Sequence, residues 1–140
     1  SYMALKYAHQ AGFLVPFGAL TTATAGDIIT VTVEAATAPA GTEVAIPFRY
    51  RLSGALGANT WGAVTTAASG GVAIASTDDN KLLWIEVDPS EVQTELADAT
   101  VVRVLLTPTG MAASLVAVLG FTSPRYKQTT HLSATAAATA

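Results

Sequence analysis

The stretch Asp27-Ile28-Ile29-Thr30-Val31-Thr32-Val33-Glu34 decides the fold class of this chain. Ile29, Val31 and Val33 alternate with polar residues, and this period of two places the three apolar side chains on one face of a β-strand. The β-branched residues of the stretch also favour strand over helix. The sequence therefore predicts a half-buried strand over residues 27–34.

Six further stretches of strand character follow, separated by turns rich in glycine, proline and asparagine. They are residues 44–52, 61–66, 72–76, 81–87, 100–107 and 114–121. About seven short strands at regular spacing predict an all-β fold, a small β-sandwich or barrel. Pro47 has no backbone N–H, so its strand is expected at a sheet edge or with a bulge there. The last two strands, joined by Pro108-Thr109-Gly110, are expected to form a hairpin.

One short helix is predicted after the strand at 81–87. Asp88 can accept hydrogen bonds from free amides of a first helical turn, and Pro89 suits the first helical position. Glu91 completes a spacing like that of a capping box. The sequence predicts a helix from these residues to about residue 96 or 97.

The two ends of the chain differ from this central part. Residues 1–25 contain Tyr7, Phe13 and Phe17 but no sustained period, and Pro16 with two glycines interrupts them. Residues 128–140 form a tail of mostly alanine and threonine. We expect an extended N-terminal arm over residues 1–25, a β domain over residues 26–127 and a C-terminal tail over residues 128–140. Because disordered tails are poor in aromatic residues, the first arm is expected to dock on its own domain or on a neighbour.

The composition argues against nucleic-acid and membrane partners. The 140 residues are 51% hydrophobic and only 12% charged, with a net charge of −3. The seven basic residues are scattered, which argues against a nucleic-acid partner. The longest apolar run, about residues 111–121, is shorter than the roughly 20 residues that span a bilayer, so no membrane partner is expected. Lys6, His9 and Pro16 interrupt the apolar N-terminus, and no signal peptide is predicted.

No reactive constellation is predicted. The two histidines, His9 and His131, lie one in each arm, away from the rigid strand ends that hold catalytic groups. There is no cysteine. Asp78-Asp79-Asn80 resembles a calcium loop only in its clustered oxygens, and a plain polar turn is the better interpretation. We expect neither an enzyme nor a cofactor or metal site.

Three strands are apolar on both faces, namely residues 81–87, 101–106 and 115–121. An isolated sandwich leaves one face of each sheet in water, so an arm, a helix or another subunit must cover these strands. Trp84 alternates out of phase with Leu83, Ile85 and Val87 and is expected to point outward, as an interface residue or beneath the N-terminal arm. Trp61 is expected in the core, opposite Tyr50 or Phe48.

Three segments together resemble small virion structural proteins of tailed bacteriophages. They are Thr22-Ala23-Thr24-Ala25-Gly26-Asp27, Lys81-Leu82-Leu83-Trp84-Ile85-Glu86-Val87-Asp88, and Val101-Val102-Arg103-Val104 with the following strand that ends at Pro124-Arg125-Tyr126. The resemblance covers about residues 20–127 and implies a capsid decoration or head-stabilisation protein. It implies a homo-oligomer such as a trimer, bound to the major capsid protein on the capsid surface after synthesis in the host cytoplasm.

A building block of this kind needs contact area rather than reactive groups. We expect its contacts in the two arms and on one strand, at Tyr7, Phe13, Phe17, Trp84, Tyr126, His131 and Leu132. Two alternatives stay open. One is an immunoglobulin-like module for carbohydrate binding or adhesion, with Trp84, Trp61 and Tyr50 as its platform. The other is a different minor virion component, in the tail or in head completion.

Overall fold

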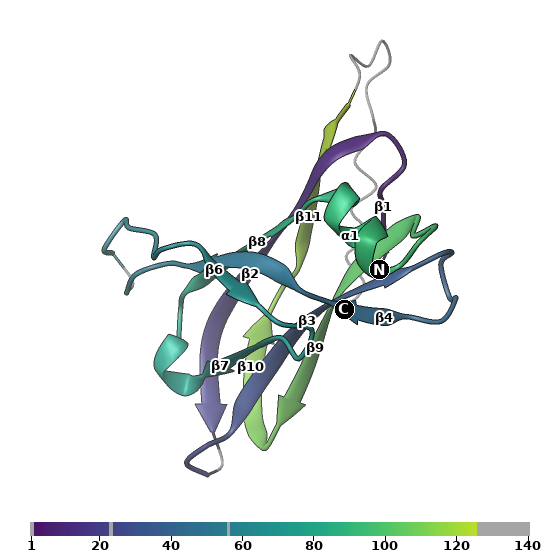
Figure 1. The fold of residues 1–140 in the computed structure, drawn as a ribbon. Coiled ribbons are helices and arrows are strands. Elements are labelled where there is room, and N and C mark those ends of the chain that lie inside the picture. The colour runs from purple at the N-terminus through teal and green to yellow at the C-terminus, as the bar shows by residue number, and fades with distance from the viewer. Residues whose placement is uncertain (1, 23, 56, 126–140) are drawn as a thin grey trace.

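The computed structural model describes residues 2–22, 24–55 and 57–125 of the chain. Within them, eleven strands form two antiparallel sheets, joined by one α-helix and one short 3-10 turn (Figure 1). The prediction of an all-β fold with one short helix is confirmed, and the two separate sheets make it sandwich-like. The strands outnumber the predicted seven because two strands form within residues 1–25, where none is predicted, and because the stretches at 44–52 and 114–121 each divide into two strands.

Each sheet has one long central strand. The five-stranded sheet contains β1 (Met3–Ala4), β9 (Val101–Thr109), β3 (Ile28–Ala36), β4 (Val44–Ile46) and β7 (Val72–Ala75), with β3 paired to β9 on one side and to β4 and β7 on the other. The six-stranded sheet contains β10 (Met111–Val116), β11 (Leu119–Pro124), β2 (Ala8–Thr22), β8 (Leu82–Val87), β5 (Phe48–Leu52) and β6 (Thr65–Ala67), with β2 between β8 and the β10 and β11 strands.

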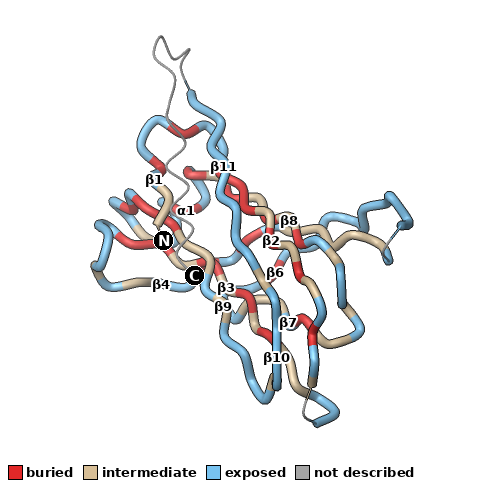
Figure 2. The backbone as a smooth tube through the Cα atoms, turned by 180° about the vertical axis from the view of Figure 1, so that it is seen from behind, coloured by how far each residue is buried: buried red, intermediate tan, exposed pale blue. Residues whose placement is uncertain are grey.

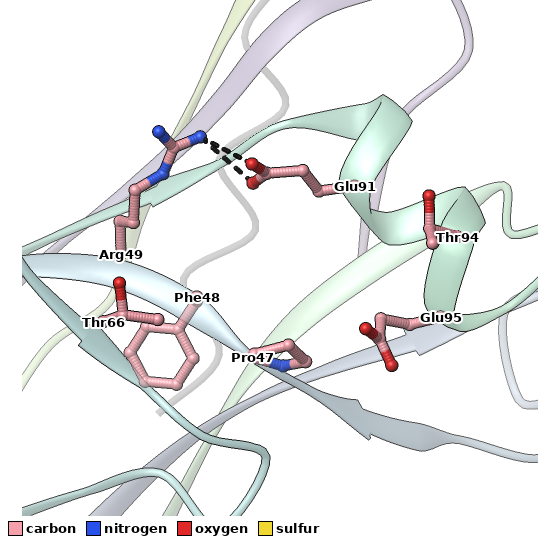
Figure 3. Close-up of a pocket in the computed structure, with 7 residues that line it drawn as sticks. All are labelled: Pro47, Phe48, Arg49, Thr66, Glu91, Thr94 and Glu95. Atoms are coloured by element: carbon pink, nitrogen blue, oxygen red, sulfur yellow. Dashed lines mark hydrogen bonds and ion pairs between the residues drawn. The ribbon is translucent and has the colours of Figure 1, made fainter.

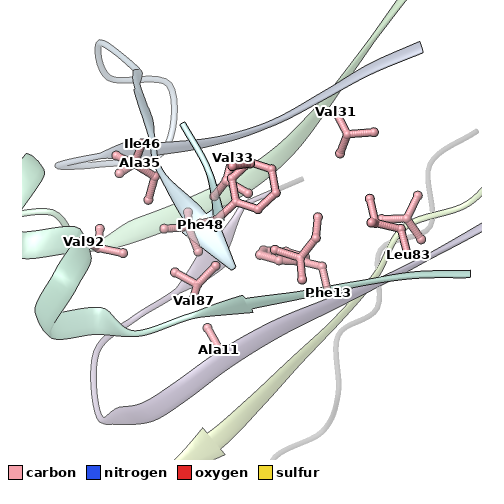
Figure 4. Close-up of a cluster of buried hydrophobic side chains, with 14 of the residues drawn as sticks. Ala11, Phe13, Val31, Val33, Ala35, Ile46, Phe48, Leu83, Val87 and Val92 are labelled. Atoms are coloured by element: carbon pink, nitrogen blue, oxygen red, sulfur yellow. The ribbon is translucent and has the colours of Figure 1, made fainter. Parts of the chain in front are cut away.

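The core fills the space between the two sheets (Figure 4). On β3, Ile29, Val31 and Val33 are at most 2% exposed, as their alternation predicts. Leu83 and Ile85 of β8 face them from the other sheet and are fully buried. Each inward strand face thus supplies its apolar residues to one common core.

Pro47 marks the point where the chain leaves one sheet for the other. β4 pairs with β3 in the five-stranded sheet, and β5, beginning one residue after Pro47, pairs with β8 in the six-stranded sheet. Since proline cannot donate a ladder hydrogen bond, it interrupts a strand at little cost where pairing changes. The expected irregularity at Pro47 is therefore a change of sheet.

Gly110 marks a second change of sheet, and here the predicted hairpin is wrong. β9 pairs with β3 from Ile28↔Thr109 to Ala36↔Val101, whereas β10 pairs with β2. Gly110 has a positive φ of 72°, which favours glycine. A glycine turn signals that the chain reverses, but it does not signal that its two flanking strands pair with each other.

The N-terminal arm is also corrected. Ala8–Thr22 forms β2, the longest strand of the described chain, which pairs with β8 on one side and β10 and β11 on the other. The described part of residues 1–25 is therefore integral to the β domain, which begins well before residue 26. The C-terminal tail, residues 128–140, lies outside the residues that the structure describes.

The helix follows the sequence prediction closely. α1 (Pro89–Glu95) begins after Asp88, whose Oδ1 accepts a hydrogen bond from the Ser90 N–H at 2.8 Å. Pro89 occupies the first turn, and Val92 is buried against the core. Among the described residues, no helix is both long enough and apolar enough to cross a membrane.

Candidate interaction surface

The outward face of the six-stranded sheet is apolar across three neighbouring strands. Leu14 of β2 pairs with Trp84 of β8 on one side and with Leu119 of β11 on the other. Directly opposite residues in an antiparallel sheet point to the same face. Their strand neighbours Phe13, Leu83 and Ile85 are buried between the sheets, so this row points outward.

Two glycines of β2 leave space that side chains of the neighbouring strands occupy. A Cβ on Gly12 would meet Cζ2 of Trp84 at 3.0 Å, and a Cβ on Gly18 would meet Cβ of Leu115 at 3.2 Å. The Trp84 and Leu115 side chains therefore extend sideways across β2. Gly12 also pairs with Phe121, whose ring centroid lies 5.9 Å from that of Trp84.

We call this surface the apolar face and define it by side chains from β2, β8, β10 and β11: Leu14, Leu82, Trp84, Leu115, Leu119 and Phe121. Leu115 is 74% exposed, Phe121 49% and Leu119 44%. Trp84 is half-buried, and its Nε1 donates to Oε1 of Glu86 at 3.1 Å. Exposed apolar side chains gathered in one place are typical of interaction surfaces.

The outward face of the other sheet has a different character. There Thr30 pairs with Thr107, and Glu34 pairs with Arg103. Apolar Leu105 is the exception, opposite Thr32. The two outer faces of the sandwich thus differ: one is dominated by threonine and an ion pair, and the other by leucine and aromatic residues.

The edge next to the apolar face carries no charge. Residues 104–124 include no acidic, basic or histidine side chain. Most of this segment is exposed along β10 and β11 (Figure 2). Charge lies on the same outward face toward β5: Glu86 is the next outward residue of β8 after Trp84, Arg51 of β5 pairs opposite Trp84, and Arg49 pairs opposite Glu86.

A shallow hollow of about 300 Å³ lies elsewhere, between β5, β6 and α1 (Figure 3). Two of its charged lining residues are paired with each other, because Nη2 of Arg49 lies 3.0 and 3.1 Å from the two carboxylate oxygens of Glu91. Both side chains are well exposed, at 44% and 65%. Glu95 also lines the hollow from α1. The pair of Arg49 and Glu91 is open to water.

The acidic turn at Asp78-Asp79 is engaged in local structure. Asp79 Oδ1 accepts from the Leu20 N–H at 2.7 Å, and Asp78 Oδ1 lies 2.8 Å from Nζ of Lys81. Asn80 has a positive φ of 57°, as a polar turn allows. The part of the chain that the structure describes holds no group of three or more acidic or histidine residues placed to bind a metal ion.

A polar cluster around Arg103 fastens the N-terminus to the five-stranded sheet. Arg103 Nε donates to Oε2 of Glu34 at 2.7 Å, and Nη2 lies 3.2 Å from Oε1 of Glu43. The Tyr2 hydroxyl donates to Glu43, which lowers the pKa of that carboxyl and raises the pKa of the phenol. The hydrogen bond to Glu34 raises the pKa of the Arg103 guanidinium. The cluster holds β1 beside β9.

The structure separates the predicted contact residues. Phe13 and Phe17 are 3% exposed, so they are core residues and not contacts with a partner. Tyr7 is 59% exposed, in a turn with a φ of 67°. Trp84 points outward as predicted and belongs to the apolar face. Tyr126, His131 and Leu132 lie outside the described residues.

The aromatic platform for a sugar does not form. Tyr50 pairs with buried Ile85 and packs against the core, whereas Trp84 lies on the opposite face of the same sheet. Trp61 was expected in the core but is 47% exposed, joined to the sheet only by an isolated bridge to Ser53. Because Tyr50 and Trp84 lie on opposite faces of the sheet, the three residues do not form one platform.

Sequence reasoning missed Leu14, Leu115, Leu119 and Phe121 as candidate contacts. The available signal was the apolar character of both faces of the strands at 81–87 and 115–121. The sequence did not predict β2 as a strand. The register of β8 and β11 on β2 is what joins their outward residues into one surface.

Comparisons with known proteins name no relative: no protein-family model, no curated protein and no solved structure matches the chain.

Proposed function

We propose that the chain is a structural protein of a bacteriophage virion that decorates the capsid and stabilises it by packing its apolar face against the major capsid protein. The resemblance of three segments to small phage virion proteins supports the class. The apolar face carries the proposal, because its side chains are exposed and the strands β10 and β11 at its edge, residues 111–124, contain no charged residue.

Burial of this face supplies the binding free energy. Removal of apolar surface from water is worth about 25 cal/mol per Å². The largest contributions should come from Leu115, Leu119 and Phe121, because they are the most exposed residues of the face and would bury the most surface. Many copies bound to one symmetric shell add avidity, so a modest contact per copy suffices. This role needs no reacting group, and it places the mature protein on the capsid surface after synthesis in the host cytoplasm.

The proposal is tested by co-sedimentation of the purified protein with shells of the phage that encodes it. Leu115→Ser and Phe121→Ser together make the apolar face polar without touching the core. We expect this double variant to bind at least about tenfold more weakly, which corresponds to about 1.4 kcal/mol.

Val64→Ser is the matched control, because Val64 is 46% exposed and precedes β6 at the opposite edge of the sheet. It should bind as the wild type does. Equal binding of the double variant, or absence of the chain from purified particles, would contradict the proposal.

A further inference from the structure

We propose that the backbone edge of β11 pairs with the same edge of a second copy of this chain, antiparallel and about a two-fold axis. This pairing goes beyond binding to a capsid, since it joins two copies through their main chains. It would extend the six-stranded sheet of one copy directly into that of the next.

The geometry of β11 provides the edge. Leu119 to Ser123 pair with Leu14 to Gln10 of β2 in unbroken register. In an antiparallel pair, every second residue points its N–H and C=O away from the partner strand. Among the described residues, no strand pairs with β11 on that outer side. Such a row of unpaired groups is a template for another strand.

The other edges are less suited to pairing. The strands β4, β6 and β7 are three or four residues long. β10 is interrupted by register shifts between Met111 and Ala113 and between Ser114 and Val116. The free part of β9 carries a charge at Arg103 and lacks an N–H at Pro108. Short length, bulges, charge and proline are the features by which proteins protect sheet edges. In β11 a register shift and a proline occur only at the end, at Ser123 and Pro124, and Leu119 to Ser123 pair without bulge, charge or proline.

The absence of charge along this edge favours a second copy as the partner. In a two-fold antiparallel pair, each residue faces a residue of its own segment, so a charged segment would repel itself. Leu119 to Ser123 contain no charged side chain and meet their copy without such repulsion. A partner recognised by charge would find no complementary group along this edge.

The pairing also has a consequence for the apolar face. A two-fold axis perpendicular to the sheet keeps the outward faces of both copies on the same side. Leu119 and Phe121 of the two copies would then lie side by side, and the two apolar faces would form one continuous surface. The two-fold geometry predicts a dimer, in contrast to the trimer that the phage resemblance implies.

Sedimentation equilibrium of the purified full chain, without shells, tests the proposal. We expect a mass of about twice the 14.3 kDa of the chain. Leu119→Lys places like charges beside the axis and should give a monomer where the wild type is a dimer. Val64→Lys introduces the same charge at a similarly exposed residue, 46% against 44%, and should stay dimeric.

A wild-type monomer, a trimer, or a Leu119→Lys dimer would overturn the proposal. If Leu119→Lys does not fold, hydrogen exchange of the wild type tests the dimer instead. Amides within Leu119 to Ser123 should exchange more slowly at high than at low protein concentration, and concentration-independent exchange would also overturn it. Because no shells are present, these results are separate from those on capsid binding.

Discussion

The rings of Trp84 and Phe121 lie 5.9 Å apart, on two strands that are not neighbours in the sheet. They meet across β2 because Gly12, which lies between them, has no side chain. The contact is tilted by 42°, an arrangement that aromatic pairs favour. One glycine thus allows two aromatic residues to form a single surface.

Replacement of Gly12 should disrupt this arrangement. In Gly12→Ala the new Cβ would lie 3.0 Å from Cζ2 of Trp84 and 3.3 Å from the Ile85 carbonyl oxygen. We expect a loss of about 1 kcal/mol in the free energy of unfolding and a shift of tryptophan fluorescence. Gly70→Ala is the control, since nothing lies within 4 Å of its Cβ position. An unchanged spectrum for Gly12→Ala would contradict the close packing.

Replacement by alanine should cost much more stability for Phe13 of β2 than for Phe121 of β11. Phe13→Ala removes a side chain that is 3% exposed and should cost about 3–5 kcal/mol in urea unfolding. Phe121→Ala alters a residue that is 49% exposed and should cost clearly less. Equal losses would show that β2 and β11 are not arranged as described.

Removal of residues 1–20 should unfold the domain. This deletion eliminates β1 and most of β2, the strand that joins β8 to β11. We expect the circular dichroism of the fragment to lack the cooperative thermal transition of the full chain. A stably folded fragment would restore the view of residues 1–25 as a detachable arm.

The Asp88 cap predicts a specific dependence on acid. Hydrogen bonds from the Ser90 hydroxyl and N–H lower the pKa of the Asp88 carboxyl in the folded protein. Its charged form therefore stabilises the fold above the unfolded-state pKa of about 4, and this contribution is lost as pH falls through the lower folded-state pKa.

Asp88→Ala should cost about 1 kcal/mol at pH 7, measured by urea unfolding. Asp88→Asn can still cap the helix but does not titrate. At pH 7 it should therefore lose less stability than Asp88→Ala, and on acidification it should lose less stability than the wild type. If both variants show the same slope of stability with pH below 4 as the wild type, the cap does not titrate as proposed.

The two arginine pairs should differ in importance. Arg49 and Glu91 are 44% and 65% exposed, and such pairs are worth at most about 1 kcal/mol, so Arg49→Met should have little effect. Arg103 is 27% exposed and Glu34 15%, so Arg103→Met leaves two shielded carboxylates without their cation. Thermal unfolding should show the larger loss for Arg103→Met, and the reverse order would contradict the cluster.

The sequence predicts strands and the helix well where local chemistry decides them. The alternation of Ile29, Val31 and Val33 and the cap at Asp88 depend on neighbouring residues only. β2 was missed because Gly12, Pro16 and Gly18 suggest a broken chain. In the fold the two glycines make room for Trp84 and Leu115, which no local pattern can reveal.

The candidate site was predictable only in part. Trp84 was found because its phase on β8 is a local property. Leu14, Leu119 and Phe121 join it only through the register of three strands far apart in sequence. Pairing of this kind is decided by tertiary structure, and the same limit explains the wrong hairpin at Gly110.

Electron cryomicroscopy of the particle that carries this chain tests the central claim most directly. The account predicts that the apolar face, from Trp84 to Phe121, lies against a neighbouring protein, with the threonine-rich face of the other sheet more open to solvent. A map in which Leu115, Leu119 and Phe121 face bulk water, or in which the chain is absent, would contradict it.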